Sequence, residues 1–203
     1  DIVHGNQCYQ DFNDIRSQFY ASSEWTSGYP AATGIGTQHG GILVDFNAVK
    51  GGIEIIPLDN DWQKAAHVYS DEVLISHRTD AEKGTPKFER GKSLSDYQCE
   101  MIYISGTAAI RGEESIVTGD VLVQTEITLE NIQHLIGLEE GREKLPEHSG
   151  KLELLRVYLK HEEDAKIVKE DMDKLCPDVP IVYLYADVCR EELLVEIEGI
   201  AYL

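Results

Sequence analysis

The clearest pattern of apolar and polar positions lies in the middle of the chain. Residues 101–105 form a short apolar run with β-branched and aromatic side chains, which is typical of a buried strand. Gly106 and Thr107 interrupt this run, and a second short apolar run follows over 108–110. A strand ending in Ser105, Gly106 and Thr107 presents a hydroxyl and free backbone N–H groups where a ligand can bind. These three residues are therefore candidate substrate-binding residues.

Helical periodicity follows this segment. Asp120 is a suitable N-cap, and leucine and isoleucine recur at helical spacing over 120–137. The other predicted elements are helices over 11–20 and 162–175 and strands over 31–37, 41–49, 53–57, 87–90, 107–111, 152–159, 181–188 and 193–201. Elements in this order predict an α+β fold with a mixed sheet and helices on one face.

The two ends of the chain show the same order of elements. A helix, a proline-containing breaker and a two-stranded hairpin are expected over 11–49 and again over 162–201, with Asp45 at the place of Glu196. The first unit then lacks its opening strands and first helix, so we expect the natural protein to extend by roughly 70–130 residues before Asp1. The predicted divisions are a partial unit over 1–57, a connecting segment over 58–85 and a complete domain over 86–203.

Composition narrows the class of protein. The 203 residues include 18 basic and 37 acidic side chains, a net charge of −19, which disfavours a nucleic-acid partner because phosphate binding needs a basic face. Four cysteines without metal-ligand spacing predict reduced thiols in a cytoplasmic protein. No apolar run approaches about 18 residues, so we expect no membrane span. The sequence has no P-loop, dinucleotide-binding loop or paired metal-binding histidines, so we expect neither a cofactor nor a metal.

Two kinds of charged residue are candidates for chemistry. By strand alternation, Glu196 and Glu198 share one face with apolar residues, and burial there would raise the pKa of a carboxyl, which suits a general acid. A solvent-exposed sheet face is the alternative. Arg90 and Arg111 are candidates for binding an anionic substrate, because a guanidinium pairs with a carboxylate through two hydrogen bonds. A surface ion pair is the alternative for each, and Arg190 allows either interpretation.

Several spaced motifs resemble the RidA (YjgF) superfamily, which includes endoribonuclease L-PSP and translation initiation inhibitor proteins, and within it the chorismatases. The motifs are ISGTAAIRGEES followed by Gly-Asp, Gln124 and Asn131, then PLDNDWQKAAHVYS, PKFERG and CREELLVEIEGIA. The resemblance covers most of the chain from Thr33 onward. It implies a RidA/YjgF-like fold with two related units in one chain, whose sheets close into a barrel as a homotrimer or pseudo-trimer.

The resemblance also implies roles for single residues. Glu196 falls where both groups carry their functional glutamate, and Arg90 falls where chorismatases carry an arginine. Cys189 falls where chorismatases that make 3-hydroxybenzoate carry a cysteine, although a small buried hydrophobe is the commoner role of a lone cysteine. Ile181 stands where the imine deaminases carry their substrate-binding arginine, which disfavours deaminase activity. The remaining polar residues in the motifs are expected to be structural: Glu198, Gln124 and Asn131.

These implied roles predict an enzyme that cleaves the enol ether of chorismate and releases pyruvate. Glu196 would donate the proton, no cofactor would take part, and the other product would be a hydroxybenzoate or a dihydrodiol. Two alternatives remain open. One is a non-catalytic RidA-fold protein that binds a small molecule or regulates, and the other is an endoribonuclease L-PSP-like protein, which the net charge disfavours.

Overall fold

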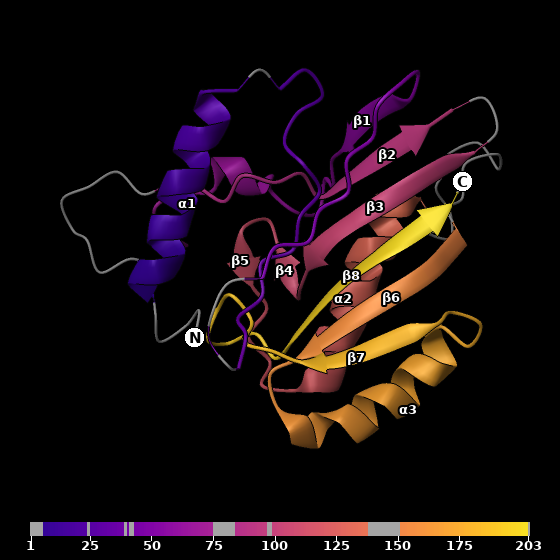
Figure 1. The fold of residues 1–203 in the computed structure, drawn as a ribbon. Helices are drawn as coiled ribbons and strands as arrows, with labels where there is room; N and C mark the ends of the chain where they lie inside the picture. The colour runs from indigo at the N-terminus through magenta and orange to yellow at the C-terminus, as the bar shows by residue number, and fades with distance from the viewer. Residues whose placement is uncertain are drawn as a thin grey trace.

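A six-stranded sheet forms the centre of the structure, a computed structural model that describes residues 6–23, 25–38, 40, 43–74, 84–96, 99–137 and 151–202 (Figure 1). In spatial order its strands are β1 (Glu54–Leu58), β2 (Gly91–Ser95), β3 (Glu100–Thr107), β8 (Val195–Tyr202), β6 (Lys151–Leu159) and β7 (Ile181–Tyr185). Neighbouring strands are antiparallel, except that β6 and β7 are parallel. The predicted α+β fold with a mixed sheet is confirmed.

Two helices cover one face of this sheet, as predicted. They are α2 (Val121–Ile136) and α3 (Ala165–Leu175), the latter preceded by a short 3-10 helix over Glu162–Asp164. The core lies between them and the sheet, because the apolar side chains of the strands and helices meet there. Its fully buried members include Ile102, Ile132, Leu155, Val157, Val168, Met172, Val195 and Ile197.

Local sequence explains the limits of α2. The Asp120 carboxylate accepts hydrogen bonds from the backbone N–H groups of Leu122 (2.9 Å) and Val123 (3.4 Å), which confirms the predicted N-cap. At the other end, Gly137 adopts the left-handed conformation with φ of 79°, which glycine accommodates without steric cost. The helix is therefore defined at both ends by its own sequence.

The predicted C-terminal hairpin is wrong. Strand β7 pairs in parallel with β6, and β6 separates it from β8. The alternation of apolar residues identified both strands, but it carries no information about which strands pair. Two predicted strand boundaries also need correction. The strand expected over 87–90 begins later, as β2. Thr107 belongs to β3, so only β4 (Ile110–Arg111) remains of the strand expected over 107–111.

The predicted N-terminal hairpin is also wrong within the described residues. The helix expected over 11–20 is present as α1 (Asn6–Ala21), and β1 matches the run over 53–57. Residues 31–37 contribute single bridges only, and 43–50 are extended without strand partners. The apolar side chains of the latter segment are exposed, Leu43 at 87% and Phe46 at 80%, so no buried face selects a strand pairing there.

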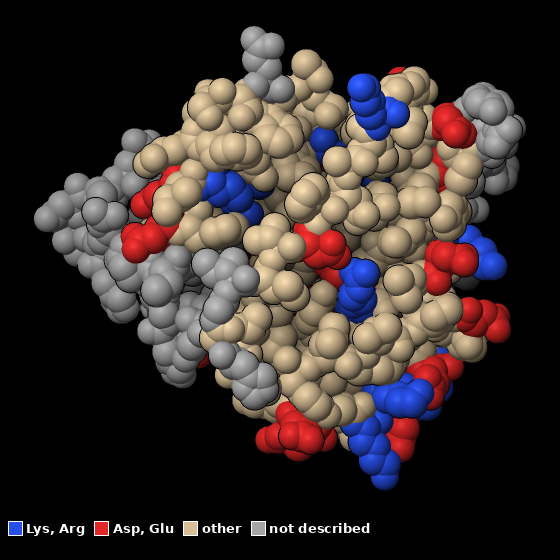
Figure 2. All heavy atoms as spheres, in the orientation of Figure 1, with Lys and Arg blue, Asp and Glu red and all other residues tan. Residues whose placement is uncertain are grey.

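The face of the sheet opposite α2 and α3 is largely open. Figure 1 shows the segment over 43–50 crossing in front of this face, and Figure 2 views the same side of the molecule. Exposed apolar residues on it include Val182 and Leu184 of β7. Among the described residues, no helix is both long and apolar enough to cross a membrane.

Candidate active site

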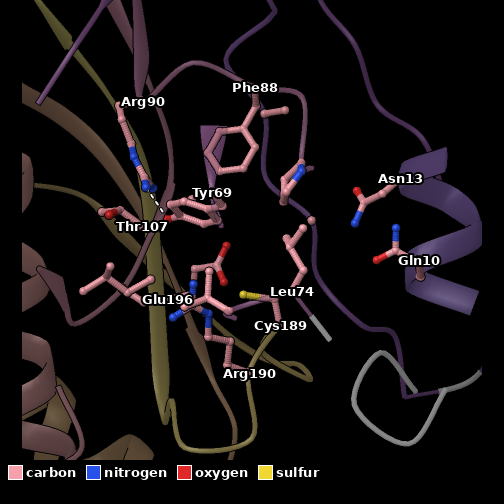
Figure 3. A pocket seen from close by; sticks show the side chains of 17 residues that line it. Gln10, Asn13, Tyr69, Leu74, Phe88, Arg90, Thr107, Cys189, Arg190 and Glu196 are labelled. Carbon is pink, nitrogen blue, oxygen red and sulfur yellow. Dashed lines mark hydrogen bonds between the residues drawn. The ribbon is translucent and has the colours of Figure 1, made fainter. Parts of the chain in front are cut away.

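A cleft lies where β3 ends and β8 begins, between the sheet and α1 (Figure 3). Its floor comes from the end of β3 and from Glu196, and its walls come from the segments near Tyr69, Phe88 and Cys189. Helix α1 closes one side. The cleft thus gathers residues from both halves of the chain around one carboxyl group.

Glu196 is the central acidic residue of this cleft. It is only 5% exposed, since β8 is a central strand of the sheet and the cleft walls cover its side chain. Burial raises the pKa of the Glu196 carboxyl to about 8, and the nearby Glu198 adds to this, while Arg90 opposes it. The carboxyl is therefore largely protonated at neutral pH and can donate a proton.

Gly106 makes room for this carboxyl. The register between β3 and β8 shifts between Ile104 and Thr107, which places an irregularity in β3 next to Glu196. A Cβ atom on Gly106 would overlap the Glu196 Oε1 atom and lie 2.6 Å from Thr33 Cγ2. The Gly106 backbone N–H donates a hydrogen bond to Thr33 Oγ1 (2.9 Å), so this strand end is fixed in place.

Two arginines line the cleft and share one aromatic neighbour. Arg90 is 4% exposed; its Nη2 donates to the Lys64 carbonyl oxygen (2.7 Å) and to the Tyr69 hydroxyl. Arg190 is 8% exposed, and its Nη1 donates to the carbonyl oxygen of Glu113 (2.8 Å). Both guanidinium carbons lie 5.5 Å from the centre of the Tyr69 ring. The cleft therefore holds two fixed positive charges beside an acid that is neutral at pH 7.

Cys189 lies beside Glu196 in the cleft, and Figure 3 shows its sulfur near the carboxyl group. Burial raises the pKa of its thiol to about 12, with a further rise from Glu196 that Arg190 partly offsets. The thiol is therefore neutral at physiological pH. Such a group is a small, weakly polar neighbour of the reacting atoms rather than a thiolate nucleophile.

The structure does not bring every predicted site residue into the cleft. Arg111 packs over Trp62 at 4.8 Å from the ring centre, and its guanidinium bonds Glu130 (2.6 Å) and Asn131 outside the lining. Ser105 lies behind the cleft, where its hydroxyl donates to the Glu89 carbonyl oxygen at 2.5 Å. Both side chains are engaged in local structure, and neither lines the cleft.

Thr107 and Gly106 do line the cleft, and Thr107 also joins a buried polar network. The Gln63 amide donates to Thr107 Oγ1 (3.0 Å), while Asn131 Nδ2 donates to the carbonyl oxygens of Ala108 (3.0 Å) and Ile110 (3.1 Å). The amide groups therefore hold the chain beyond β3 in the conformation that shapes the floor.

Glu198 points to the same side of β8 as Glu196 but has a structural set of partners. It accepts hydrogen bonds from Arg156 (2.5 Å) and from the Tyr158 hydroxyl (2.8 Å). Gln124 of α2 braces the loop before β8, donating to the Glu192 carbonyl oxygen (3.0 Å) and accepting from the Leu194 N–H (2.8 Å). These contacts agree with the structural roles expected for both residues.

Sequence reasoning missed several residues that line the cleft, among them two aromatic and two buried polar side chains. Tyr69 and Phe88 lie in motifs of the resembled family, but neither was singled out. Gln10 and Asn13 come from α1 and are 2% and 1% exposed. Helix α1 thus buries polar side chains and exposes its apolar ones, the reverse of the usual pattern, so periodicity pointed to the other face.

Comparison with known proteins identifies the fold. No family model matches the chain. The crystal structure of a chorismatase superposes with a TM-score of 0.72 over 95% of this chain and 57% of that one, at 28% identity. A yeast protein, YEO7, superposes with a TM-score of 0.50 over 73% of this chain and 98% of that one, at 12% identity, a likeness of fold alone. The fold is that of the RidA/YjgF proteins.

Sequence comparison is more specific. The chain is 35% identical to a chorismatase of Streptomyces rapamycinicus over 84% of its own length and 50% of that protein. It is 32% identical to a 3-hydroxybenzoate synthase of Streptomyces hygroscopicus over 98% of its own length and 59% of that protein. The chain thus spans about half the length of the curated relatives it matches. Over most of its own length it is similar to chorismatases, and it has the fold of the RidA/YjgF proteins.

Proposed function

We propose that the protein cleaves the enolpyruvyl ether of chorismate and releases pyruvate. The observation that carries the proposal is a buried carboxyl, Glu196, with a pKa of about 8 in a cleft that also holds two immobilised guanidinium groups. A protonated acid is what an enol ether needs, because its methylene carbon is the basic site. The names of the similar proteins, chorismatase and 3-hydroxybenzoate synthase, support the same reaction.

The proposed chemistry begins with proton transfer. Glu196 gives its proton to the methylene carbon of the enolpyruvyl group, and the π electrons form the new C–H bond. The adjacent carbon becomes an oxocarbenium ion, which water attacks to form a hemiketal. Collapse of the hemiketal breaks the ether C–O bond, releases pyruvate and leaves the hydroxyl on the ring product. Attack by a ring hydroxyl or ring carbon instead of water would give the hydroxybenzoate-type product.

The charges of the cleft suit this substrate. Chorismate carries two carboxylates, and Arg90 and Arg190 supply two positive charges beside a neutral acid. Arg90 makes both of its hydrogen bonds through Nη2, and its buried Nε has no partner among the described residues. Rigid anchoring of these groups favours catalysis by positioning and preorganised electrostatics.

Pyruvate release tests the proposal. We expect the full-length protein to release pyruvate from chorismate and the Glu196→Gln variant to lose about 10²-fold or more in rate, because it keeps the shape but not the proton. Glu153→Gln, on an exposed part of β6, is the matched control and should keep wild-type activity. Cys189→Ala should change the product mixture more than the rate.

Binding and turnover separate the alternatives. A wild-type protein that binds chorismate but releases no pyruvate would be a small-molecule binding protein instead. Salt-dependent binding to RNA with no response to chorismate would indicate the endoribonuclease-like alternative.

Assembly and location follow from the same proposal. The open sheet face and the exposed apolar residues of β7 support a trimer or pseudo-trimer of RidA-like units, in which neighbouring sheets would cover this face. We also propose a cytoplasmic location, supported by the free thiols of Cys99, Cys176 and Cys189.

A further inference from the structure

The turn between β4 and β5 (Glu114–Ser115) contacts a distant segment that carries part of the cleft wall. The Gly112 N–H donates to the Trp62 carbonyl oxygen, and the Lys64 N–H donates to the Gly112 carbonyl oxygen, each at 2.7 Å. This pair of bonds fixes the start of the segment over 62–70 against the turn.

Glu113, at the tip of this turn, binds the other end of the segment through its carboxylate. Its Oε2 accepts from Lys64 Nζ and from the Ser70 N–H, and its Oε1 accepts from Ser70 Oγ, all at 2.8 Å. The Lys64 hydrogen bond, followed by those from Ser70, lowers the pKa of the Glu113 carboxyl to about 2. The group therefore remains an anion across the physiological range, and its contacts persist with it.

Both hydrogen-bond acceptors of Arg90 lie in the segment that Glu113 holds. They are the Lys64 carbonyl oxygen and the hydroxyl of Tyr69, which directly precedes Ser70. The same turn accepts hydrogen bonds from Arg190 through the Glu113 carbonyl oxygen and Ser115 Oγ. The position of Arg90 thus depends on a carboxylate that does not line the cleft.

Arg90 has a competing partner in Glu196. Within the described residues no hydrogen bond or ion pair joins the two side chains, although both line the cleft. A guanidinium released from its acceptors would move toward the carboxyl, because an ion pair would stabilise the ionised form. The other titratable groups that face Glu196 are Glu198 on the same strand, Tyr158 on β6, and Cys189 and Arg190 on the preceding loop.

We propose that Glu113 is a positioning residue that holds the Tyr69 segment so that Arg90 stays bound to it and away from Glu196. Glu196 thereby keeps its proton while Arg90 stays available to an anionic ligand. The catalytic benefit rests on the proposed function, whereas the positioning itself does not. A structural brace without this effect would leave the protonation of Glu196 unchanged.

Infrared titration of Glu196 without substrate tests the proposal. The carbonyl band of the protonated side chain is assigned by its loss in Glu196→Gln. We expect a midpoint near pH 8 in the wild type and in the control variant Glu114→Gln, which changes the exposed first residue of β5. Glu113→Ala should lower the midpoint by about one unit or more, the usual effect of an opposite charge that approaches a carboxyl. A folded Glu113→Ala variant with the wild-type midpoint would overturn the proposal.

Two further variants keep the test decisive if Glu113→Ala does not fold. Tyr69→Phe removes only the hydroxyl acceptor of Arg90, and Glu113→Gln removes only the charge, so each should shift the midpoint in the same direction by a smaller amount. In an Arg90→Met background the Glu113 substitution should have no effect on the midpoint, because the mobile cation is gone. A shift that persists without Arg90 would contradict the mechanism.

Catalysis supplies an independent readout. If chorismate is cleaved, Glu113→Ala should move the alkaline limb of the kcat/KM profile to lower pH, while a general folding defect would reduce the rate at every pH. If no pyruvate is released, the infrared result still decides the positioning role, so the two proposals succeed or fail separately.

Discussion

Protonation of Glu196 is the property of a single residue on which the proposed chemistry depends. Burial and Glu198 both disfavour its ionised form, and Arg90 favours that form without pairing to it. A carboxyl in this position is protonated below pH 8 and ionised above, whereas an exposed glutamate ionises near pH 4.5.

Activity should therefore fall as pH rises through about 8, because the proton donor is lost. The kcat/KM profile for pyruvate release, measured from pH 5 to 10 at constant ionic strength, checks this. A rate that stays constant to pH 10 would show that another group supplies the proton.

Gly106 is the second residue whose identity the site requires. In Gly106→Ala the new methyl group would overlap Glu196 Oε1 and Thr33, so the carboxyl must move. We expect the rate of pyruvate release to fall at least about tenfold, since displacements of about 1 Å cost up to 10²-fold. Gly52→Ala is a suitable control, because the space around Gly52 is open. Gly112→Ala is not, because a side chain at its φ of 60° would strain the backbone.

At the scale of single elements, α2 determines the conformation of the loop that leads into β8. Gln124 is fully buried, and its amide bonds the Glu192 carbonyl oxygen and the Leu194 N–H, two backbone groups in the loop between Cys189 and Glu196. Helix α2 thus fixes the loop that forms part of the cleft wall through the side chain of Gln124.

Gln124→Ala should reduce the free energy of unfolding by about 1–3 kcal/mol, because two partly buried backbone groups lose their partners. Activity should fall as well, since the loop carries Cys189 and Arg190 into the cleft. Urea unfolding and pyruvate release measure the two effects. Glu126→Ala, an exposed position on the same helix, should change neither; equal effects of both substitutions would point to a loss of helix stability alone.

At the scale of the whole molecule, the distribution of charge and apolar surface bears on partners. On the face shown in Figure 2, Lys and Arg side chains are interspersed with Asp and Glu rather than gathered in a basic patch. Together with the net charge of −19 of the whole chain, this distribution over the described residues disfavours a phosphate backbone as partner. Its apolar positions, such as Val182 and Leu184, suit contact with another RidA-like unit.

A double variant, Val182→Lys and Leu184→Lys, should therefore dissociate the proposed assembly while the monomer remains folded. Sedimentation velocity measures the assembly, and circular dichroism checks the fold. Ile167→Lys is the matched control, since it adds charge at a similarly exposed apolar position of α3, across the sheet. An oligomer that survives the double variant would show that this face is not the interface.

The sequence by itself determined the elements that depend on local patterns. The helix from Val121 to Ile136, with its Asp120 cap and Gly137 terminus, and the strands β3, β6 and β8 follow from periodicity and capping chemistry. The alternation in β8 also indicated correctly that Glu196 and Glu198 share a face. The motif resemblance correctly indicated the similarity to chorismatases and the RidA/YjgF-like fold, because several spaced motifs occur in the same order.

Tertiary structure decided what local patterns do not encode. Strand pairing brought β7 beside β6, and the lack of a covering partner left residues 43–50 unpaired. Long-range contacts also decided the burial of Glu196 and the presence of Arg90 rather than Arg111 in its cleft. The inward orientation of Gln10 and Asn13 on α1 depends on long-range contacts as well. The physical reason is that periodicity reports which residues share a face, whereas desolvation and charge pairing depend on what the rest of the chain places against that face.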